Sequence, residues 1–562
     1  MDDKKLESQV KSSADGDVSA GETMVLSKDE QQLAKLGYKQ GLSTRDFQGI
    51  WLIRGAGRLM NAPPEFFRHL GLFESWAATY ITMNFVSGLP VLFGFAMYTG
   101  GPKAAFANWT MVGGLSFVLS LAMAEIAAAF PTAGGIYFWS YRLGGKRYGR
   151  LLSWMTAWWN WVGWICVVPG VQQGATNFLL SALEVKYPGS SVVRQGWFSW
   201  LVTALGLVLA MLPNVISPTV LKLYFRFALF VFCGLFVFYW IWFPIKAAGR
   251  FQSGSEVFNK FYNGINLGPE KQASDAYAWT VGILFGAWDF SGYDASAHLA
   301  EETNQATDHV ATGMWAGTLC TWVLSVPTLI MILFCMQDFD GIVSASYPNN
   351  WAEYLVQLIG PDGAAAFLVL LWLDSTCATA SCFMSAQRVT FAISRDGVLP
   401  FSRYFRRLSA RRVPVHAALL VFFLGIAVTC AVIGSTVAFS AITATATIVT
   451  NVSYLIPIAA RHTIGRRDFQ PARFNLGRYS AVVGAVSAFY IMLIFVVLTL
   501  PQLYPVTAQT LNYAPICIAI VTIISLAGWI LPFGLGGRHW FEGPKRTIDD
   551  DSSGGGEPLR AG

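Results

Sequence analysis

Charged residues are scarce in this chain. Asp, Glu, Lys and Arg make up 13% of its 562 residues, whereas a typical soluble domain carries roughly 25%. So little charge cannot cover the surface of a water-soluble protein of this size. Hydrophobic residues account for 54% of the chain, and its mean hydropathy is +0.46. The composition therefore excludes a soluble multidomain enzyme and indicates an integral membrane protein.

The chain also lacks the motifs of metal, nucleotide and nucleic-acid binding. Its eight cysteines lie in apolar stretches and form no CxxC pair. No phosphate-binding loop occurs, and the net charge of +6 forms no dense basic stripe. We therefore expect no enzymatic activity, no cofactor or metal, and no nucleic-acid partner. Transport by such a chain would draw its energy from an ion gradient.

Long apolar runs fill most of the sequence. A helix of about 20 apolar residues crosses the roughly 30 Å of hydrocarbon in a bilayer. This length predicts an all-α domain of twelve transmembrane helices over residues 72–532. The predicted spans are 74–97, 105–130, 150–183, 197–216, 220–243, 276–300, 310–337, 363–392, 415–434, 437–460, 480–500 and 513–532. Residues 132–149 and 350–359 predict short additional helices.

Polar tails flank this domain. We expect residues 1–71 and 533–562 to be cytoplasmic tails, because most of the 39 Lys and Arg residues then fall on the cytoplasmic side. The N-terminus lacks the apolar core of a secretory signal. Segment 45–70 is atypical, and an interfacial helix, an insertion and a gene-model artefact all stay open for it. We favour the plasma membrane over the vacuolar or another organelle membrane.

Two predicted spans contain helix-breaking residues. In the first span, Gly88 and Pro90 interrupt the run from Phe85 to Pro90, and in the sixth the run Ser291–Ser296 contains Gly292. Broken backbone at membrane depth is tolerated where protein or a water-filled cavity satisfies it. Breaks in the first helix of each of two five-helix halves indicate an inverted-repeat transporter with its site between them.

The broken backbone predicts the substrate site. Free amide groups attract a carboxylate and free carbonyl groups attract an ammonium, so a zwitterionic amino acid matches both. The predicted substrate-binding residues are Ser87, Gly88, Ser291, Gly292, Tyr293 and Asp294. For Asp294 two roles stay open, namely contact with a substrate ammonium and acceptance of hydrogen bonds inside the break.

Several segments make the sequence similar to a known family. They include Leu121–Gly135, Ser291–Thr303 and Phe391–Pro400. The chain resembles the amino acid/choline transporter family of the amino acid–polyamine–organocation superfamily, in particular GABA permeases and bidirectional amino acid transporters. This resemblance implies a leucine-transporter-type 5+5 inverted repeat plus two extra helices, with helices 1 and 6 broken. It also implies secondary transport of amino acids or GABA, with protons favoured and sodium open as the coupling ion.

Ionisable residues within spans are candidates for ion coupling or gating, because burying them in a membrane is costly. The candidates are Glu125, Arg226, Asp289, His298 and Asp374, together with Ser375 beside the last of them. Structural roles stay open for each. For Glu125, pairing with cytoplasmic arginines as a gate and a role in proton relay both stay open, with the first favoured. Arg226 either replaces a sodium ion or snorkels to the interface. His298 either titrates during transport or is a hydrogen-bonded core residue.

The sequence therefore predicts a permease for amino acids, GABA or related amines, working by alternating access. Its partners are a small amino compound and membrane lipid, and the oligomeric state is open. Two other functions also stay open. One is a permease for choline or polyamines, and the other is an amino acid sensor that does not transport.

Overall fold

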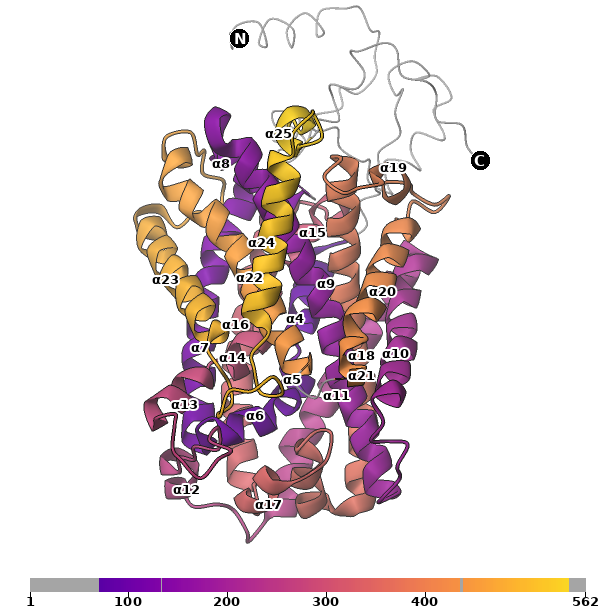
Figure 1. Cartoon of the computed structure of the whole chain (residues 1–562), viewed down its shortest axis with the longest axis vertical. Coiled ribbons are helices and arrows are strands. Elements are labelled where there is room, and N and C mark those ends of the chain that lie inside the picture. The colour runs from indigo at the N-terminus through magenta and orange to yellow at the C-terminus, as the bar shows by residue number, and fades with distance from the viewer. Residues whose placement is uncertain (1–69, 133, 435–437, 545–562) are drawn as a thin grey trace, which may run out of the picture. The chain divides into compact units, whose positions relative to one another are not determined.

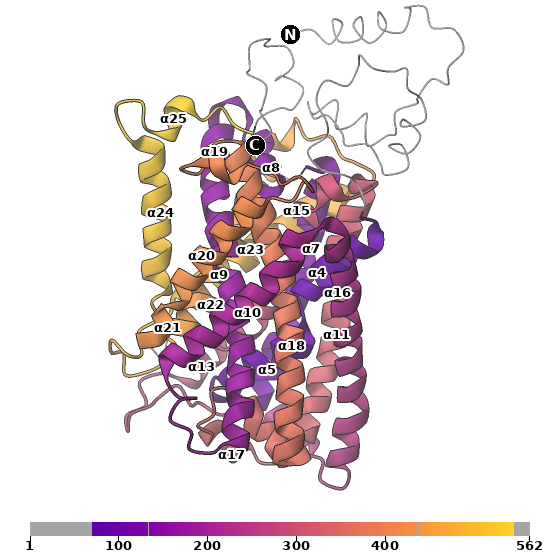
Figure 2. The same ribbon diagram turned by 90° about the vertical axis from the view of Figure 1, so that its right-hand side faces the viewer.

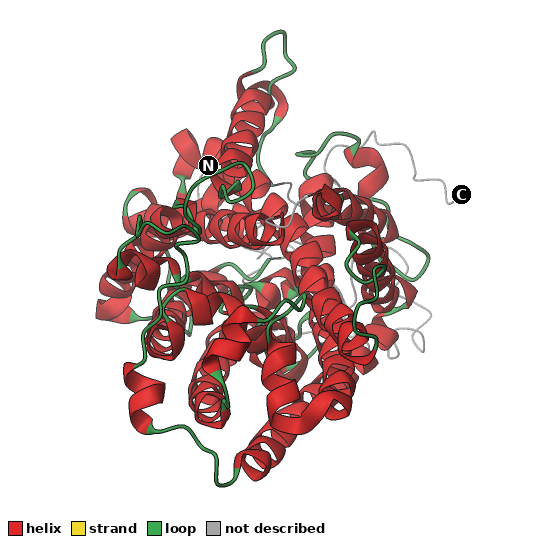
Figure 3. Ribbon diagram, turned by 60° about the horizontal axis from the view of Figure 1, so that its bottom comes forward, coloured by secondary structure: helices red, strands yellow, loops and turns green. Residues whose placement is uncertain are grey.

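The computed structural model describes residues 70–132, 134–434 and 438–544, and its regular structure is helical (Figures 1 and 3). Within these ranges, extended pairing is limited to three isolated bridges. A helix satisfies its own backbone hydrogen bonds, which suits a chain that is mostly apolar. Eight helical segments in the described part are long and apolar enough to cross a membrane.

The long helices follow the predicted spans closely. They are α7 (Gly101–Ala129), α9 (Gly145–Lys186), α10 (Gly196–Ile216), α11 (Pro218–Ala247), α16 (Ala306–Cys335), α18 (Trp351–Arg395), α20 (Val415–Thr429), α21 (Ala431–Gly434), α22 (Ala438–His462), α23 (Ser480–Thr499) and α24 (Ala514–Ile530). Each of the twelve predicted spans is helical over most of its length, whereas eight segments have the length and hydropathy of a membrane crossing.

Short helices connect these elements. They are α8 (Gly135–Leu143), α12 (Gly254–Asn259), α17 (Phe339–Ser344), α19 (Ser402–Phe405) and α25 (Gly537–Trp540). Helix α8 confirms the prediction for residues 132–149. The predicted short helix at 350–359 is confirmed as the first part of α18, which a non-helical Gly360 (φ 81°) separates from the rest of that element. Glycine permits this left-handed conformation, and the following Pro361 disfavours a helical residue before it.

Two segments are broken into short helices inside the bundle. The first contains α4 (Leu72–Thr82), α5 (Phe85–Val91) and α6 (Phe93–Tyr98). The second contains α13 (Asp275–Val281), α14 (Leu284–Asp289), α15 (Ala295–His298) and the 3-10 turn η1 (Ala300–Glu302). Two views place α4 and α5 among the long helices α9, α16 and α18 (Figures 1 and 2). These broken segments position the candidate site.

The first break lies earlier than the sequence predicted. Helix α4 ends at Thr82 and α5 runs from Phe85 through Pro90, so the expected interruption at Ser87–Pro90 is wrong. Asn84 begins the new helix, because its Oδ1 accepts hydrogen bonds from the amides of Val86 and Ser87 at 3.1 and 3.4 Å. The break therefore lies at Met83–Asn84, where the side chain of Asn84 caps α5.

Pro90 is accommodated inside α5 by a neighbouring helix. Proline has no N–H, so the carbonyl of Val86, four residues earlier, loses its helical partner. The hydroxyl of Tyr239 on α11 donates a hydrogen bond to this carbonyl at 3.0 Å. The proline therefore leaves a carbonyl free to bond to α11, and α5 continues through it.

The second break agrees with the sequence at Ser291–Asp294. Helix α14 ends at Asp289, and α15 begins at Ala295, so Ala295 and Ser296 belong to the helix that follows. Gly292 has a φ of 97°, a conformation that L-residues with side chains rarely adopt. In the described part of the chain, the amide groups of Ser291 and Gly292 make no backbone hydrogen bond.

The predicted tails are only partly described. Segment 45–70 lies outside the described residues except for Leu70. Leu70 pairs with the end of η1 and the residues just after it. Its amide donates to the carbonyl of Glu302 at 3.0 Å, and its carbonyl accepts from the amide of Asn304 at 2.9 Å. At the other end, Trp540 of α25 packs on Trp154 of α9 with ring centroids 5.6 Å apart. The first part of the 533–562 segment is thus packed against a helix.

Candidate binding site

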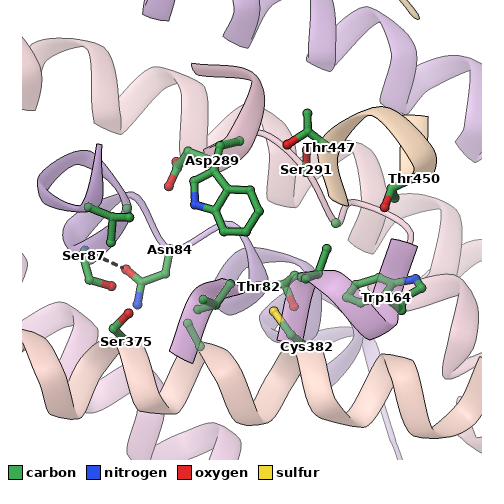
Figure 4. Close-up of a pocket in the computed structure, with 17 residues that line it drawn as sticks. Thr82, Asn84, Ser87, Trp164, Asp289, Ser291, Ser375, Cys382, Thr447 and Thr450 are labelled. Carbon is green, nitrogen blue, oxygen red and sulfur yellow. Dashed lines mark hydrogen bonds between the residues drawn. The ribbon is translucent and has the colours of Figure 1, made fainter. Parts of the chain in front are cut away.

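A small cavity lies between the two breaks (Figure 4). Its volume of about 40 Å³ is the space of about three water molecules. Five parts of the fold form its walls: α4–α5, α9, the region from α14 to Gly292, α18 and α22. The lining residues are Thr82, Asn84, Ser87, Gly88, Val91, Trp164, Val167, Val171, Trp288, Asp289, Ser291, Gly292, Ser375, Ala378, Cys382, Thr447 and Thr450.

Half of the residues singled out in the sequence line this cavity. They are Ser87, Gly88, Asp289, Ser291, Gly292 and Ser375. The other half, namely Tyr293, Asp294, Glu125, Arg226, His298 and Asp374, are not among its walls. Breaks far apart in the sequence thus meet at one place, which the matched positions of the breaks predicted.

Each break places a glycine against a side chain of the other broken segment. A Cβ atom on Gly88 would lie 1.5 Å from Oδ1 of Asp289, and one on Gly292 would lie 2.4 Å from Cγ2 of Thr82. Neither position has room for a larger residue without movement of its neighbour. The glycines therefore allow the close approach of the two broken segments that forms the cavity.

Asp289 is the one carboxylate in the cavity wall. Its side chain is 7% exposed, and Oδ2 is buried without a hydrogen-bond partner in the described part of the chain. In Figure 4 its carboxylate lies on the same side of the cavity as Ser87 and Asn84. No Lys, Arg or His is among the lining residues. The cavity wall thus contains an acidic side chain and no basic side chain.

Asp374 holds the first break in place from behind the wall. It is fully buried on α18, and its Oδ2 accepts a hydrogen bond from Nδ2 of Asn84 at 2.7 Å. The same Asn84 caps α5 through its Oδ1, an interaction with Ser87 that is drawn as a dashed line in Figure 4. Asp374 therefore acts on the cavity through the orientation of Asn84.

Asp294 lies at the centre of a buried hydrogen-bond cluster outside the cavity. It accepts hydrogen bonds from the hydroxyl of Tyr454 at 2.7 Å and from Nε1 of Trp164 at 3.3 Å, and Nε2 of His298 lies 3.0 Å from its Oδ2. Tyr293 packs on Tyr454 with ring centroids 5.2 Å apart. Of the two roles predicted for Asp294, this geometry favours the structural one. The donors, however, are side chains and not the expected backbone amides.

Glu125 and Arg226 lie away from the cavity. Glu125 is buried and accepts hydrogen bonds from the hydroxyl of Ser480 at 2.5 Å and from the amide of Leu476 at 3.2 Å. It thus holds the chain before α23, and the expected arginine pairing is not its main contact. Arg226 is exposed on α11 and has no ion-pair partner among the described residues. This exposure agrees with snorkelling and not with a sodium-like position.

Several wall residues were missed in the sequence. Thr447 and Thr450 on α22 line the cavity, as do Trp164 and Trp288. The threonine-rich run Thr443–Thr450 in an apolar span was the available signal, because hydroxyl groups in a span either join helices or face a cavity. The tryptophans carried no such signal among the 21 in the chain.

Two ion pairs, one of them buried, join η1 to the end of α18. Nε of Arg388 lies 3.1 Å from Oε1 of Glu302, and Nη1 of Arg395 lies 3.4 Å from Oε2 of Glu301. Arg388 and Glu302 are both buried. Within the described ranges, no group of three or more His, Cys, Asp and Glu residues is arranged to hold a metal ion. These charges therefore belong to the packing of the second broken segment.

The sequence is similar to several transporters over most of its length. It is 29% identical to the amino-acid permease BAT1 of Arabidopsis thaliana over 544 residues, which cover 93% of this chain and 98% of that protein. It is 28% identical to the thiamine transporter thi9 of Schizosaccharomyces pombe, with 84% of each chain covered. It is 25% identical to a GABA-specific permease of Saccharomyces cerevisiae, with 93% of this chain and 87% of that permease covered.

A family model agrees with these likenesses. The model described as amino acid permease matches residues 73–523, which include both breaks and every wall of the cavity. The eight apolar helices of the described part and the family match make the chain an integral, multi-pass membrane protein and a transporter, not an enzyme. It belongs to the amino acid permease family.

Proposed function

We propose that this protein is a secondary active transporter that moves amino acids, GABA or related amino compounds across a membrane by alternating access. The observation that carries this proposal is the cavity between two broken helices. It combines a carboxylate with backbone amides that have no partner in the described structure. An amino compound presents the two groups that match: an ammonium for Asp289 and a carboxylate for the amides at Ser291 and Gly292.

The proposed architecture has twelve spans in a leucine-transporter-type 5+5 inverted repeat, followed by two extra helices. Breaks in the first and sixth predicted spans support it, because corresponding breaks are typical of inverted-repeat transporters. Both termini are then cytoplasmic, and the plasma membrane is the proposed location. In this arrangement, rocking of one bundle against the other exposes the cavity to each side in turn.

The proposed energy source is the proton gradient, with sodium as the alternative. This choice rests on the resemblance noted in the sequence. Uptake that rises with an imposed pH gradient and does not respond to sodium supports it, and the reverse pattern replaces it.

An organic cation is the second candidate substrate class. The cavity wall contains a carboxylate and two tryptophans but no cationic residue, a combination that also suits a quaternary or multiple ammonium group. One relative is a thiamine transporter. Choline, polyamines and thiamine therefore enter the same test. A non-transporting sensor would bind one of these compounds without moving it.

The test is uptake by the full-length protein in proteoliposomes. Labelled GABA, alanine, choline, putrescine and thiamine are supplied with and without a pH gradient. Uptake of GABA or alanine above protein-free liposomes supports the proposal. Uptake of only choline, putrescine or thiamine would show that the substrates are organic cations and not amino acids. Binding without any uptake, measured as a ligand-induced rise in melting temperature, supports the sensor.

A further inference from the structure

We infer that Asp289 is the counter-ion for the positively charged nitrogen of the transported molecule. This inference rests on the proposed function and assigns a partner for the substrate nitrogen within the proposed site. It assigns to Asp289 a contact for which the sequence offered the free carbonyl groups of the breaks or the side chain of Asp294.

Asp289 differs from the other buried acids. Asp294 has three donors around it, Asp374 accepts from Asn84, Glu125 accepts two hydrogen bonds, and Glu302 pairs with Arg388. Asp289 makes no hydrogen bond and no ion pair among the described residues, although its Oδ2 is buried. Among the residues that the structure describes, Asp289 is thus the buried acid left for a partner from outside.

The energetics favour a cation as this partner. A buried carboxylate without a hydrogen bond or a counter-charge is strongly unfavourable. Because no Lys, Arg or His lines the cavity, the wall cannot supply the counter-charge. An ammonium group entering the cavity would supply both a positive charge and hydrogen-bond donors, and charge-assisted hydrogen bonds are the stronger kind.

The cavity also fixes the direction in which the molecule lies. Figure 4 shows Asp289 and Thr450 at separate places around the cavity, with Ser291 and Thr447 beside each other between them. Oγ1 of Thr450 is buried and has no partner in the described part of the chain. The nitrogen at Asp289 therefore leaves the other polar end of the molecule facing hydroxyl groups and the amides of the second break.

Gly88 fixes where the carboxylate stands. Oδ1 of Asp289 occupies the space that a Cβ atom on Gly88 would fill, at 1.5 Å from that position. A methyl group there would push the carboxylate away from its place in the wall. Gly88→Ala thus tests the position of the charge without removing it.

The experiment compares the KM for GABA in four variants of the full-length transporter in proteoliposomes. In Asp289→Asn the KM is expected to rise at least about tenfold, because a hydrogen bond to a charged group is lost, while the maximal rate changes less. In Asp289→Glu, which keeps the charge, the rise is expected to be smaller. Gly88→Ala is expected to raise the KM as well. Asp362→Asn is the matched control, since Asp362 is exposed and pairs with Lys186.

A KM within about twofold of the wild type in Asp289→Asn would overturn the inference while leaving transport itself intact. If a variant does not transport, its Kd for GABA is measured from the shift in melting temperature, with the same expected rise. If the variant does not fold, the inference is tested on the wild-type protein by measuring how well two GABA analogues inhibit GABA uptake. Butylamine should inhibit GABA uptake and butyrate should not, and the reverse order would overturn the inference. Absence of uptake for every amino compound would instead refute the proposed function.

Discussion

Gly292 and Thr82 hold the two breaks together: a Cβ atom at Gly292 would lie 2.4 Å from Cγ2 of Thr82, and the φ of Gly292 is 97°. Substitution by alanine therefore meets both a steric contact and a backbone conformation that costs about 1–3 kcal/mol. We expect Gly292→Ala to lower the melting temperature and to reduce GABA uptake strongly. Size-exclusion chromatography after heating and proteoliposome uptake measure the two effects.

The matched control is Gly234→Ala on α11, where nothing lies within 4 Å of an added Cβ atom. It should leave uptake unchanged and should not lower the melting temperature, because alanine favours a helix more than glycine does. Wild-type stability and uptake in Gly292→Ala would show that the packing of the two breaks is not tight.

Asn84→Ala removes both the cap of α5 and the hydrogen bond to Asp374. Loss of a helix cap costs about 1 kcal/mol, and Asp374 is left buried without its amide partner. We expect lower stability and a higher KM for GABA, because Ser87 and Gly88 lie on the helix that Asn84 begins. The comparison is Ser253→Ala, which removes the cap of α12 on an exposed part of the chain. A change in KM as large in Ser253→Ala would contradict the role given to Asn84.

Asp294→Asn tests the buried cluster around the second break. The amide cannot accept from Tyr454, Trp164 and His298 with the strength of a carboxylate, so unfolding should become easier by about 2–3 kcal/mol. The KM for GABA should change much less than in Asp289→Asn. Tyr454→Phe, which removes one donor, should cost about 1 kcal/mol. A larger KM change in Asp294→Asn than in Asp289→Asn would return Asp294 to the binding site.

Cys382 gives a chemical probe of the cavity, because it is the one cysteine in the wall. A small thiol reagent is expected to inhibit uptake, and excess GABA is expected to protect against it, since both occupy the same space. Cys382→Ala should abolish the protected part of the inhibition. Cys377→Ala is the comparison, because Cys377 is buried nearby on α18 but does not line the cavity. Protection that persists in Cys382→Ala would place the substrate elsewhere.

Glu302→Gln leaves Arg388 buried beside a neutral partner at the end of α18. Breaking a buried ion pair from one side typically costs about 3–5 kcal/mol, whereas apolar replacement of both partners is often neutral. We expect a large fall in melting temperature for Glu302→Gln and a recovery in the double variant Glu302→Leu, Arg388→Met. If the double variant is no more stable than Glu302→Gln, the pair is not what holds η1 to α18.

The sequence predicted the helices better than the breaks. Apolar run length located a helical segment at each predicted span, because a helix that crosses a bilayer needs a long apolar stretch. Eight segments of the described chain have the length and hydropathy of a membrane crossing. The first break was misplaced because proline and glycine were given more weight than Asn84, whose capping role depends on a side-chain conformation. The carbonyl of Val86, which Pro90 leaves without a helical partner, accepts from the hydroxyl of Tyr239, which lies 153 residues away in the chain. The position of this hydroxyl follows from tertiary packing.

The candidate site was predicted in part for a similar reason. The second break and the acid just before it are visible in the sequence, and they pointed to Ser291 and Asp289. Ser87 was also predicted, although the first break was misplaced. The sequence does not show which of the two acids already accepts hydrogen bonds from the protein. Asp294 and Asp289 are five positions apart, yet only the packing of Tyr454 and Trp164 reveals that Asp294 is occupied.

The pairing of Leu70 with Glu302 and Asn304 has a mechanical consequence. The residue that leads into the first broken segment is fastened by two backbone hydrogen bonds to the residues that leave the second one. A pull on either segment at this end is transmitted to the other through the backbone and does not depend on side-chain identity. Displacement of one broken segment at this end therefore displaces the other as well.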